Sequence, residues 1–284
     1  MKTVNSLSGG KTSSYIAIHY PADYNVFSLV RTNDLNCKYP DKKVRQIVSD
    51  LLQVDFVGTL EQDSIIPVML KLSEKVNIDW ITGEVFEDIV KKFKGKNGKY
   101  YLPNIMTRYC TTHLKLIPIF NYWRQNINEI VDMRIGFRKG EERRSNKMIS
   151  KLIDGVDEMK TVIGKRGTQN KWGMIKWRVP SFPLIDDGIT AIDINNYWNK
   201  NNFLGFKKGY YNNCVGCFHR SPLFLNKMSQ EHKNKMQFFA NLENENSPNT
   251  FKSDVKYNDI IKWHPQAEIT FDDFNECDTG FCGL

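Results

Sequence analysis

The sequence lacks the features of a membrane-spanning, low-complexity or disordered chain. Its longest apolar stretches, such as residues 65–70 with an internal proline, are far shorter than the roughly 20 residues of a membrane helix. The polar run SGGK occupies the place where a secretory signal would carry its apolar segment, so we expect no such signal. Hydrophobic residues make up 40% of the chain, enough for a sizeable core. We therefore expect a globular protein of the reducing cytoplasm, with no membrane partner.

Cysteine is scarce and unevenly placed. The chain has six cysteines, and four of them form two close pairs, one C-x-x-C and one C-x-x-x-x-C. These four are Cys214, Cys217, Cys277 and Cys282. In a reducing compartment such pairs are more often metal ligands or reactive thiols than a disulfide framework. Cys37 has no partner nearby in sequence and is assigned a structural role, and none of the five histidines shows HxxxH or HExxH spacing.

Positive charge exceeds negative charge. Forty Lys and Arg residues stand against 32 Asp and Glu residues, which gives a net charge of +8. This balance suits an anionic ligand such as a nucleotide, a sulfate ester or the backbone of a nucleic acid. The same balance also occurs as a simple solubility feature, so the charge alone does not choose a partner.

Strands and helices are predicted to alternate over the first half of the chain. The expected strands are residues 1–7, 24–31, 54–60, 78–82 and 131–137, and the expected helices are residues 12–19, 41–52, 65–76 and 112–123. This order predicts an α/β fold with an open, mostly parallel sheet and helices on both faces. Beyond Arg138 the alternation breaks down, although residues 191–199 are again helical in pattern. We place one domain at 1–148 and a smaller, irregular region with the cysteine pairs at 149–284.

The run SGGKTSS lies between the first expected strand and the first expected helix. Glycines at such a turn let backbone N–H groups approach an anion closely, and the helix N-terminus adds partial positive charge. A Walker A loop is disfavoured because the required first glycine is replaced by Asn5. The run instead resembles the SGGxxS loop of the PP-loop ATPases. Thr12 stands where many of those enzymes carry an aspartate, and the alternative is a turn that only caps a helix.

Two further segments extend this resemblance. RYCTTHLKLIP, residues 108–118, places two cations and a thiol at the start of a helix, and IGFRKGEERR, residues 135–144, clusters charges at the end of a strand. Ligands of open α/β sheets collect at such strand ends. With the SGGKTSS run and PSFPLIDD, these segments resemble the phosphoadenosine phosphosulfate reductase family, a branch of the PP-loop group that binds adenine nucleotides.

The resemblance implies roles for individual residues. The loop would hold phosphates, Thr32 would lie beside the adenosine, and the later cations would surround the phosphosulfate or the leaving group. Glu141 would orient an arginine, bind a metal or form an ordinary salt bridge. The nucleotide-binding residues implied are Ser8, Gly9, Gly10, Lys11, Thr12, Ser13, Thr32, Arg108, Gly136 and Glu141. The residues implied in catalysis are Lys115, Arg138, Arg144 and Cys282, the last as a thiol nucleophile on a C-terminal tail.

The same resemblance implies a four-iron, four-sulfur cluster. Its relatives hold the cluster with a Cys-Cys pair and a later C-x-x-C, and the first cysteine of that pair is replaced here by Tyr109. Cys110, Cys214 and Cys217 would be three ligands, and Cys277 or Cys282 would supply the fourth. A zinc ion on the two close pairs and metal-free thiols are the alternatives.

Three functions follow as hypotheses. A reductase would act on a sulfonucleotide (phosphoadenosine phosphosulfate or adenylyl sulfate) with a thioredoxin-like reductant. An adenylating sulfurtransferase would use ATP with Mg²⁺ and a sulfur carrier on nucleic acid, and the basic run around residues 91–99 favours it. A non-catalytic nucleotide- or nucleic-acid-binding module with structural zinc is the third. The oligomeric state stays open.

Overall fold

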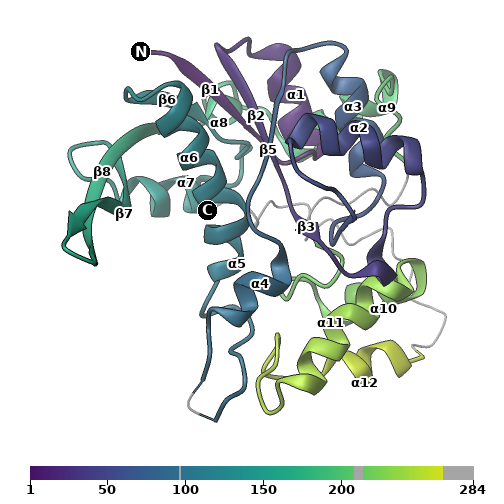
Figure 1. Ribbon diagram of the computed structural model, residues 1–284. Coiled ribbons are helices and arrows are strands. Elements are labelled where there is room, and N and C mark those ends of the chain that lie inside the picture. The colour runs from purple at the N-terminus through teal and green to yellow at the C-terminus, as the bar shows by residue number, and fades with distance from the viewer. Residues whose placement is uncertain (96, 208–213, 265–284) are drawn as a thin grey trace. The chain divides into compact units, whose positions relative to one another are not determined.

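The computed structural model describes residues 1–95, 97–207 and 214–264. It confirms an α/β fold with a six-stranded, mostly parallel sheet and flanking helices (Figure 1). The strands are β1 (Thr3–Leu7), β2 (Tyr24–Leu29), β3 (Arg31–Thr32), β4 (Gly58–Thr59), β5 (Asp79–Thr82), β6 (Val131–Arg134), β7 (Asp157–Arg166) and β8 (Gln169–Ser181). No helix of these described residues is long and apolar enough to cross a membrane.

Helices connect most of the strands. The first eight helical segments are α1 (Lys11–His19), η1 (Leu35–Cys37), α2 (Lys42–Leu52), α3 (Ile65–Ser73), α4 (Phe86–Lys91), α5 (Tyr109–Thr111), the π-helical turn η2 (Thr112–Leu116) and α6 (Ile117–Asn126). They are followed by α7 (Glu142–Ile149), α8 (Pro183–Asp186), α9 (Ala191–Lys200), α10 (Pro222–Glu231), α11 (Lys233–Glu245) and α12 (Tyr257–Lys262).

The strand order creates one reversal point in the sheet. The order is β5-β2-β1-β6-β8-β7, and β1 pairs in parallel with both β2 and β6. From β1 the chain first adds strands on one side, and it later returns to add β6 on the other side. In open α/β sheets, ligands bind beyond the carboxyl ends of the strands at such a switch point. The carboxyl ends of β1 and β6 are therefore the place to look for a ligand site.

The described chain forms two compact units that interleave along the sequence. The first unit comprises Met1–Phe27, Val68–Asp79 and Ile119–Phe206, and the second comprises Ser28–Pro67, Trp80–Pro118 and the chain from Lys207 onward. Because each unit is made of several segments, the two units do not test the predicted boundary near Met148, which stays a prediction.

The core of the first unit is aromatic. Trp177 of β8 is fully buried, and the rings of Phe120 and Trp123 from α6 lie 5.4 and 6.0 Å from it, centroid to centroid. The central strand β2 is buried from its second residue to its end, whereas β6 alternates, with Val131 and Met133 buried and Asp132 and Arg134 partly exposed. The predicted helix at 191–199 is confirmed as α9.

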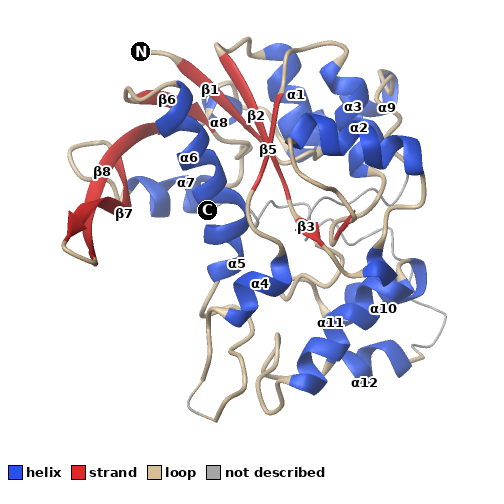
Figure 2. Ribbon diagram, viewed as in Figure 1, coloured by secondary structure: helices blue, strands red, loops and turns tan. Residues whose placement is uncertain are grey.

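The second unit has a helical core. Helices α10, α11 and α12 pack together (Figure 2), and Phe239, Phe251 and Tyr257 lie at their centre. The described part of the C-terminal region is thus more regular than the sequence suggested.

One predicted strand is wrong in extent and in partner. Residues 54–60 were expected to form a parallel strand, but only Gly58–Thr59 is extended, and it pairs antiparallel with β3 in a separate two-stranded sheet. The chain packs closely at Gly58, where a Cβ would lie 2.0 Å from the carbonyl oxygen of Cys37. Glycine without a side chain allows this approach and weakens a longer strand.

Candidate functional site

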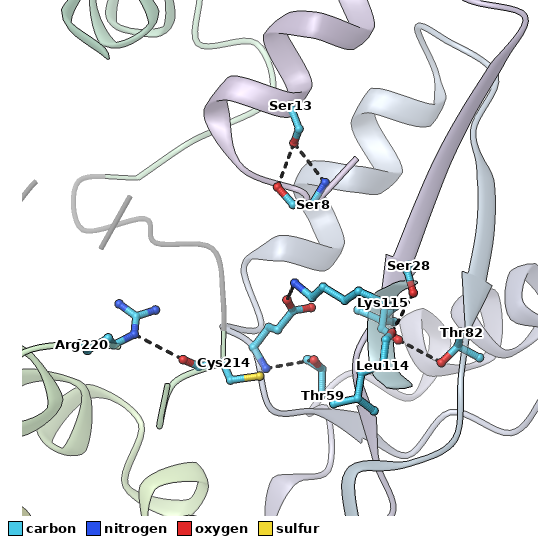
Figure 3. A network of polar contacts seen from close by, with 11 residues as sticks. Ser8, Ser13, Ser28, Thr59, Thr82, Leu114, Lys115, Cys214 and Arg220 are labelled. Atoms are coloured by element: carbon cyan, nitrogen blue, oxygen red, sulfur yellow. Dashed lines mark hydrogen bonds and ion pairs between the residues drawn. The ribbon is translucent and has the colours of Figure 1, made fainter. Parts of the chain in front are cut away.

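The turn between β1 and α1 is held by its own serines. The Ser13 hydroxyl accepts hydrogen bonds from the Ser8 N–H at 3.2 Å and from the Ser8 hydroxyl at 3.3 Å (Figure 3). It donates to the Gly10 carbonyl at 3.1 Å. Gly9 has a φ of +74°, which favours glycine, and Gly10 starts the helix without a side-chain cap. The first turn of α1 carries no acidic residue, so its positive end is not countered by a carboxylate there.

Helix α9 fixes the start of α1 from the side. The Lys11 ammonium donates to the Asn195 Oδ1 at 3.0 Å, and the indole N–H of the buried Trp198 donates to the Lys11 carbonyl at 2.9 Å. The Tyr197 ring packs edge-on against Tyr15. These contacts hold Lys11 beside the turn, where a cation can meet an anionic ligand.

The segment after β6 passes directly beside this turn. A Cβ on Gly136 would lie 3.3 Å from the Thr12 Cγ2. Gly136 is therefore close to the first turn of α1, and a larger residue would press on it. Thus SGGKTSS and IGFRKGEERR, which are separated by more than 120 residues, meet at the carboxyl ends of β1 and β6.

Two arginines of this segment share one carboxylate. The Glu141 Oε2 accepts from the Arg138 Nε at 3.0 Å and from the Arg138 backbone N–H at 2.9 Å, while Oε1 pairs with Arg144. The Arg138 and Glu141 side chains are largely buried. The Arg144 guanidinium lies 4.1 Å from the centroid of the Phe137 ring. Glu141 was expected to orient Arg138 or Arg144, bind a metal or form an ordinary salt bridge, and it pairs with both arginines and holds them in a fixed geometry.

The remaining predicted residues belong to the second unit. Lys115 in η2 pairs with Glu61, with 3.1 Å between Nζ and Oε1 (Figure 3), and the Glu61 side chain is fully buried. The Glu61 Oε2 has no hydrogen-bond partner among the described residues. Lys235, also buried, donates to the Glu61 carbonyl and to the Asp63 carboxylate, the latter at 2.7 Å. Two buried lysines thus meet one short acidic segment.

The turn from Cys214 to Arg220 lies against this segment. Glu61 and Cys214 form an antiparallel bridge, and the Val215 N–H donates to the Leu60 carbonyl at 2.8 Å. The Nε of the buried Arg220 donates to the Cys214 carbonyl at 3.3 Å (Figure 3). The Tyr257 hydroxyl donates to the Gly216 carbonyl at 3.0 Å. Burial raises the pKa of Tyr257, so this hydroxyl keeps its proton and stays a donor.

The segment that carries Arg108 and Cys110 begins a distorted helix. Arg108 precedes α5, and the π-helical turn η2 follows at once. Such turns free backbone groups and are frequent at functional sites. The Ser28 hydroxyl donates to the Leu114 carbonyl within η2 at 2.9 Å (Figure 3). The Tyr109 ring stacks on Phe93 with 3.8 Å between centroids, so this residue, which stands where the cluster-binding proteins that the sequence resembles would carry a cysteine, packs as an aromatic.

Thr32 is buried and hydrogen-bonded within the fold. Its side chain is fully buried, and its hydroxyl donates to the Glu87 Oε1 at 2.6 Å. The Asn33 N–H donates to the same oxygen at 2.9 Å. Thr32 therefore orders the end of β3, and its predicted role in nucleotide binding stays untested.

The described cysteines do not assemble a metal site. Among residues 1–95, 97–207 and 214–264, no three His, Cys, Asp or Glu side chains gather as metal ligands. Cys110 and Cys214 both pack against the apolar core of the second unit, and Cys217 is buried. Cys277 and Cys282 lie outside the described residues. The iron–sulfur cluster and the zinc site stay predictions, and no chemical step is derived through either.

Several site residues escaped the sequence analysis. Glu61, Lys235 and Arg220 are charged residues far apart in sequence, and no local spacing links them. The one available signal is the position of Arg220 three residues after Cys217. Asn195 and Trp198 were expected only as parts of a helix, although they hold Lys11.

The resemblance predicted from the sequence rests on four motifs and on their order along the chain. SGGKTSS, RYCTTHLKLIP, IGFRKGEERR and PSFPLIDD carry it, and the first and third of these meet in the folded chain. No protein-family model matches the chain, and no curated protein or solved structure matches it significantly.

Proposed function

We propose that the chain is an enzyme that binds an adenine nucleotide at the β1–α1 turn and performs sulfur chemistry of the phosphoadenosine phosphosulfate reductase type. The observation that carries the proposal is the meeting of the SGGKTSS turn with the Gly136 segment at the switch point of the sheet. A sheet of this topology binds ligands there, and the residues at this point offer backbone N–H groups, hydroxyls and cations.

The turn suits a nucleotide phosphate. Gly9 and Gly10 carry no side chain to keep an anion away, and the N-terminus of the nine-residue α1 adds partial positive charge. Lys11 lies at the same place, held through Asn195. We assign the turn and Lys11 to the phosphates of ATP or of a sulfonucleotide.

The paired arginines suit developing negative charge. Arg138 and Arg144 are fixed by Glu141, so little reorganisation is needed when charge grows on a bridging oxygen. One preorganised donor of this kind is worth about 3 to 4 kcal/mol in the transition state. We assign these two arginines to the leaving phosphate and Glu141 to their orientation.

In the reductase form of the proposal, a cysteine thiolate attacks the sulfur of the phosphosulfate. A sulfur–sulfur bond forms, the sulfur–oxygen bond to the phosphate breaks, and the nucleotide leaves with the electron pair. A thioredoxin-like dithiol then reduces the resulting thiosulfonate, releases sulfite and is itself oxidised to a disulfide. Cys282 is the proposed nucleophile, and a reducing compartment such as the cytoplasm keeps it as a thiol.

Nucleotide binding by variants tests the proposal. Lys11→Ala and Arg138→Ala are expected to weaken binding of ATP or adenylyl sulfate by tenfold or more in calorimetry, with unchanged circular dichroism. Lys139→Ala is the matched control, because this neighbouring lysine is exposed and pairs only with Glu142 among the described residues. Equal affinity in wild type and both site variants would overturn the assignment.

The reaction products separate the chemical classes. A sulfonucleotide reductase releases sulfite in the presence of thioredoxin and loses this activity with Cys282→Ser. An adenylating enzyme exchanges pyrophosphate with ATP in the presence of Mg²⁺, and Cys282→Ser leaves that exchange intact. A nucleotide-binding module gives neither product.

An ATP-dependent sulfurtransferase that acts on nucleic acid is the second candidate. The basic run at residues 91–99 supports it less than expected, because Lys91 and Lys92 form ion pairs with Asp88 and Glu84. Lys99 donates to the Glu245 carbonyl. The observation that favours this candidate is a second basic element, the β7–β8 hairpin.

A further inference from the structure

Strands β7 and β8 form an arm that extends beyond the sheet. Only the end of β8 pairs with β6, from Arg178 to Ser181. The preceding part of β8 pairs only with β7, from Lys176 at one end to Gln169 at the tip. The connecting turn has two residues, with Gly167 at a φ of +62°. Figure 1 shows this hairpin as a two-stranded ribbon at the edge of the first unit. We call residues 158–176 the arm.

The arm is strongly basic. The arm contains one acidic residue, Glu158, which lies opposite Lys176 at its base. The five cations of the arm are Lys160, Lys165, Arg166, Lys171 and Lys176, and all five are exposed. Lys176 pairs with Asp154 across 2.8 Å. The other four lie along a narrow ribbon, where their mutual repulsion is relieved by a polyanion.

Large apolar side chains are exposed between these cations. Trp172 is 58% exposed and Met174 is 55% exposed. In the strand register, Trp172 lies opposite Val162, while Lys160 opposes Met174 and Lys165 opposes Asn170. Residues directly opposite one another share a face of the ribbon. An exposed indole therefore has a lysine on each side of it along the same face.

A purely protective role explains only half of this pattern. Strand β7 is the edge of the sheet, and lysines on an edge strand prevent pairing with other chains. An exposed tryptophan and methionine have the opposite effect, because exposed apolar surface promotes association with other molecules. A partner that is both anionic and able to stack on an indole accounts for both features. Single-stranded nucleic acid has this combination, with phosphates for the cations and unpaired bases for the ring.

We propose that the arm binds a single strand of nucleic acid, with phosphates on Lys160, Lys165 and Lys176, which share the face of Trp172 in the strand register, and an unpaired base stacked on Trp172. This inference rests on the proposed function in its nucleic-acid form, and it adds the surface that would bind the strand. The cations of the arm supply the affinity, and the stacking selects unpaired bases over a duplex.

Fluorescence anisotropy with a labelled 20-nucleotide single strand and with its duplex tests this on the full chain. We expect Lys160→Ala/Lys165→Ala/Lys176→Ala to weaken single-strand binding at least about tenfold at low salt. The slope of log affinity against log salt should fall by about 2, since each lost phosphate contact removes about 0.7 on a single strand. Trp172→Ala should cost about 5- to 100-fold, and Trp172→Phe much less.

The control removes the same charge elsewhere. Lys42→Ala/Lys43→Ala/Lys75→Ala replaces three exposed lysines of other helices and loops and should change the slope little. Equal losses in the two triple variants, or tighter binding of the duplex than of the single strand, would overturn the proposal. ATP binding is measured on the same variants. Arm variants that bind the single strand more weakly but bind ATP as well as wild type would support the proposal. Lys11→Ala tests the nucleotide site independently, through its effect on ATP binding.

Discussion

The β1–α1 turn and the Cys214–Arg220 turn are both tight loops with polar chemistry, but they are built in opposite ways. The first is stabilised by neutral groups that lie within six residues of one another, chiefly Ser8, Gly10 and Ser13. The second is held by groups from distant parts of the chain, namely the Leu60 carbonyl, the Tyr257 hydroxyl and the Lys252 ammonium, and its own buried Arg220 donates to the Cys214 carbonyl.

The difference predicts how each loop responds to substitution. A turn that satisfies its own backbone leaves N–H groups directed outward and can change ligands with little effect on the fold. The Cys214–Arg220 turn is bridged to Glu61, which pairs with Lys115 and accepts a hydrogen bond from Lys235. Its stability therefore depends on the pairing of buried charge, because an uncompensated buried charge is costly. Substitutions near the second turn should therefore unfold the chain before they alter its chemistry.

Lys115→Ala is expected to have the largest effect on stability. It leaves the fully buried Glu61 carboxylate without its ion-pair partner, and breaking a buried pair on one side costs about 3 to 5 kcal/mol. Urea denaturation followed by circular dichroism measures the loss. Lys92→Ala is the control, because its pair with Glu84 is about half exposed and should contribute no more than about 1 kcal/mol. Similar losses in both variants would contradict the burial argument.

Gly216→Ala is expected to follow. The new Cβ would lie 2.3 Å from the ring of Phe239, which is itself buried. Overpacking of a filled core costs about 1 to 3 kcal/mol. Gly164→Ala in the arm is the matched control, since a Cβ there meets nothing within 4 Å. A denaturation midpoint equal to that of Gly164→Ala would show that the second turn is looser than its contacts indicate.

The same contrast explains what the sequence could predict. The strand, glycine turn and helix at residues 1–19 are local, and each was expected close to its observed bounds. The parallel direction of β1, β2 and β6 follows from the alternation of strands and helices, whereas their order and register do not. The candidate site in the first unit was predictable because its motifs follow directly after strands.

The rest depends on contacts that no local pattern encodes. Glu61 follows the segment that was predicted to be a strand, and it forms an isolated antiparallel bridge with Cys214, far away in the sequence. No strands were predicted in the arm, because its glycines and lysines interrupt the apolar pattern to which Val162, Trp172 and Met174 belong. Helices α10 to α12 pack on a core whose residues come from several segments far apart in the sequence, so the sequence of each helix alone does not show which of its faces is buried.

The stability of the second region is expected to fall with acidity. Burial, and then the nearby Lys235, lower the pKa of His232 from its ordinary 6.5 to about 4. Between these two values the unfolded chain takes up a proton that the folded chain excludes. Stability is therefore full above about pH 6.5 and decreases as the pH falls toward 4.

Denaturation midpoints at pH 7.5 and pH 5.0 measure this effect. Wild type should lose more stability over the interval than His232→Gln, which has no proton to take up. His113 also has a lowered pKa, and it contributes equally to both proteins. Equal losses of stability in the two proteins would show that protonation of His232 does not cause the acid sensitivity.

Trp198→Phe is expected to have the smallest effect on stability and the most informative effect on binding. The change removes the indole N–H that holds the Lys11 carbonyl, which costs about 0.5 to 1.5 kcal/mol. Trp123→Phe is a matched control in the same unit, because its indole N–H donates to the Glu129 carbonyl at 2.7 Å from an equally buried position. The two variants should lose similar stability, but only Trp198→Phe should weaken nucleotide binding, since it alone loosens the start of α1. Equal affinities in calorimetry would mean that the β1–α1 turn is held by Ser8 and Ser13 alone and owes nothing to α9.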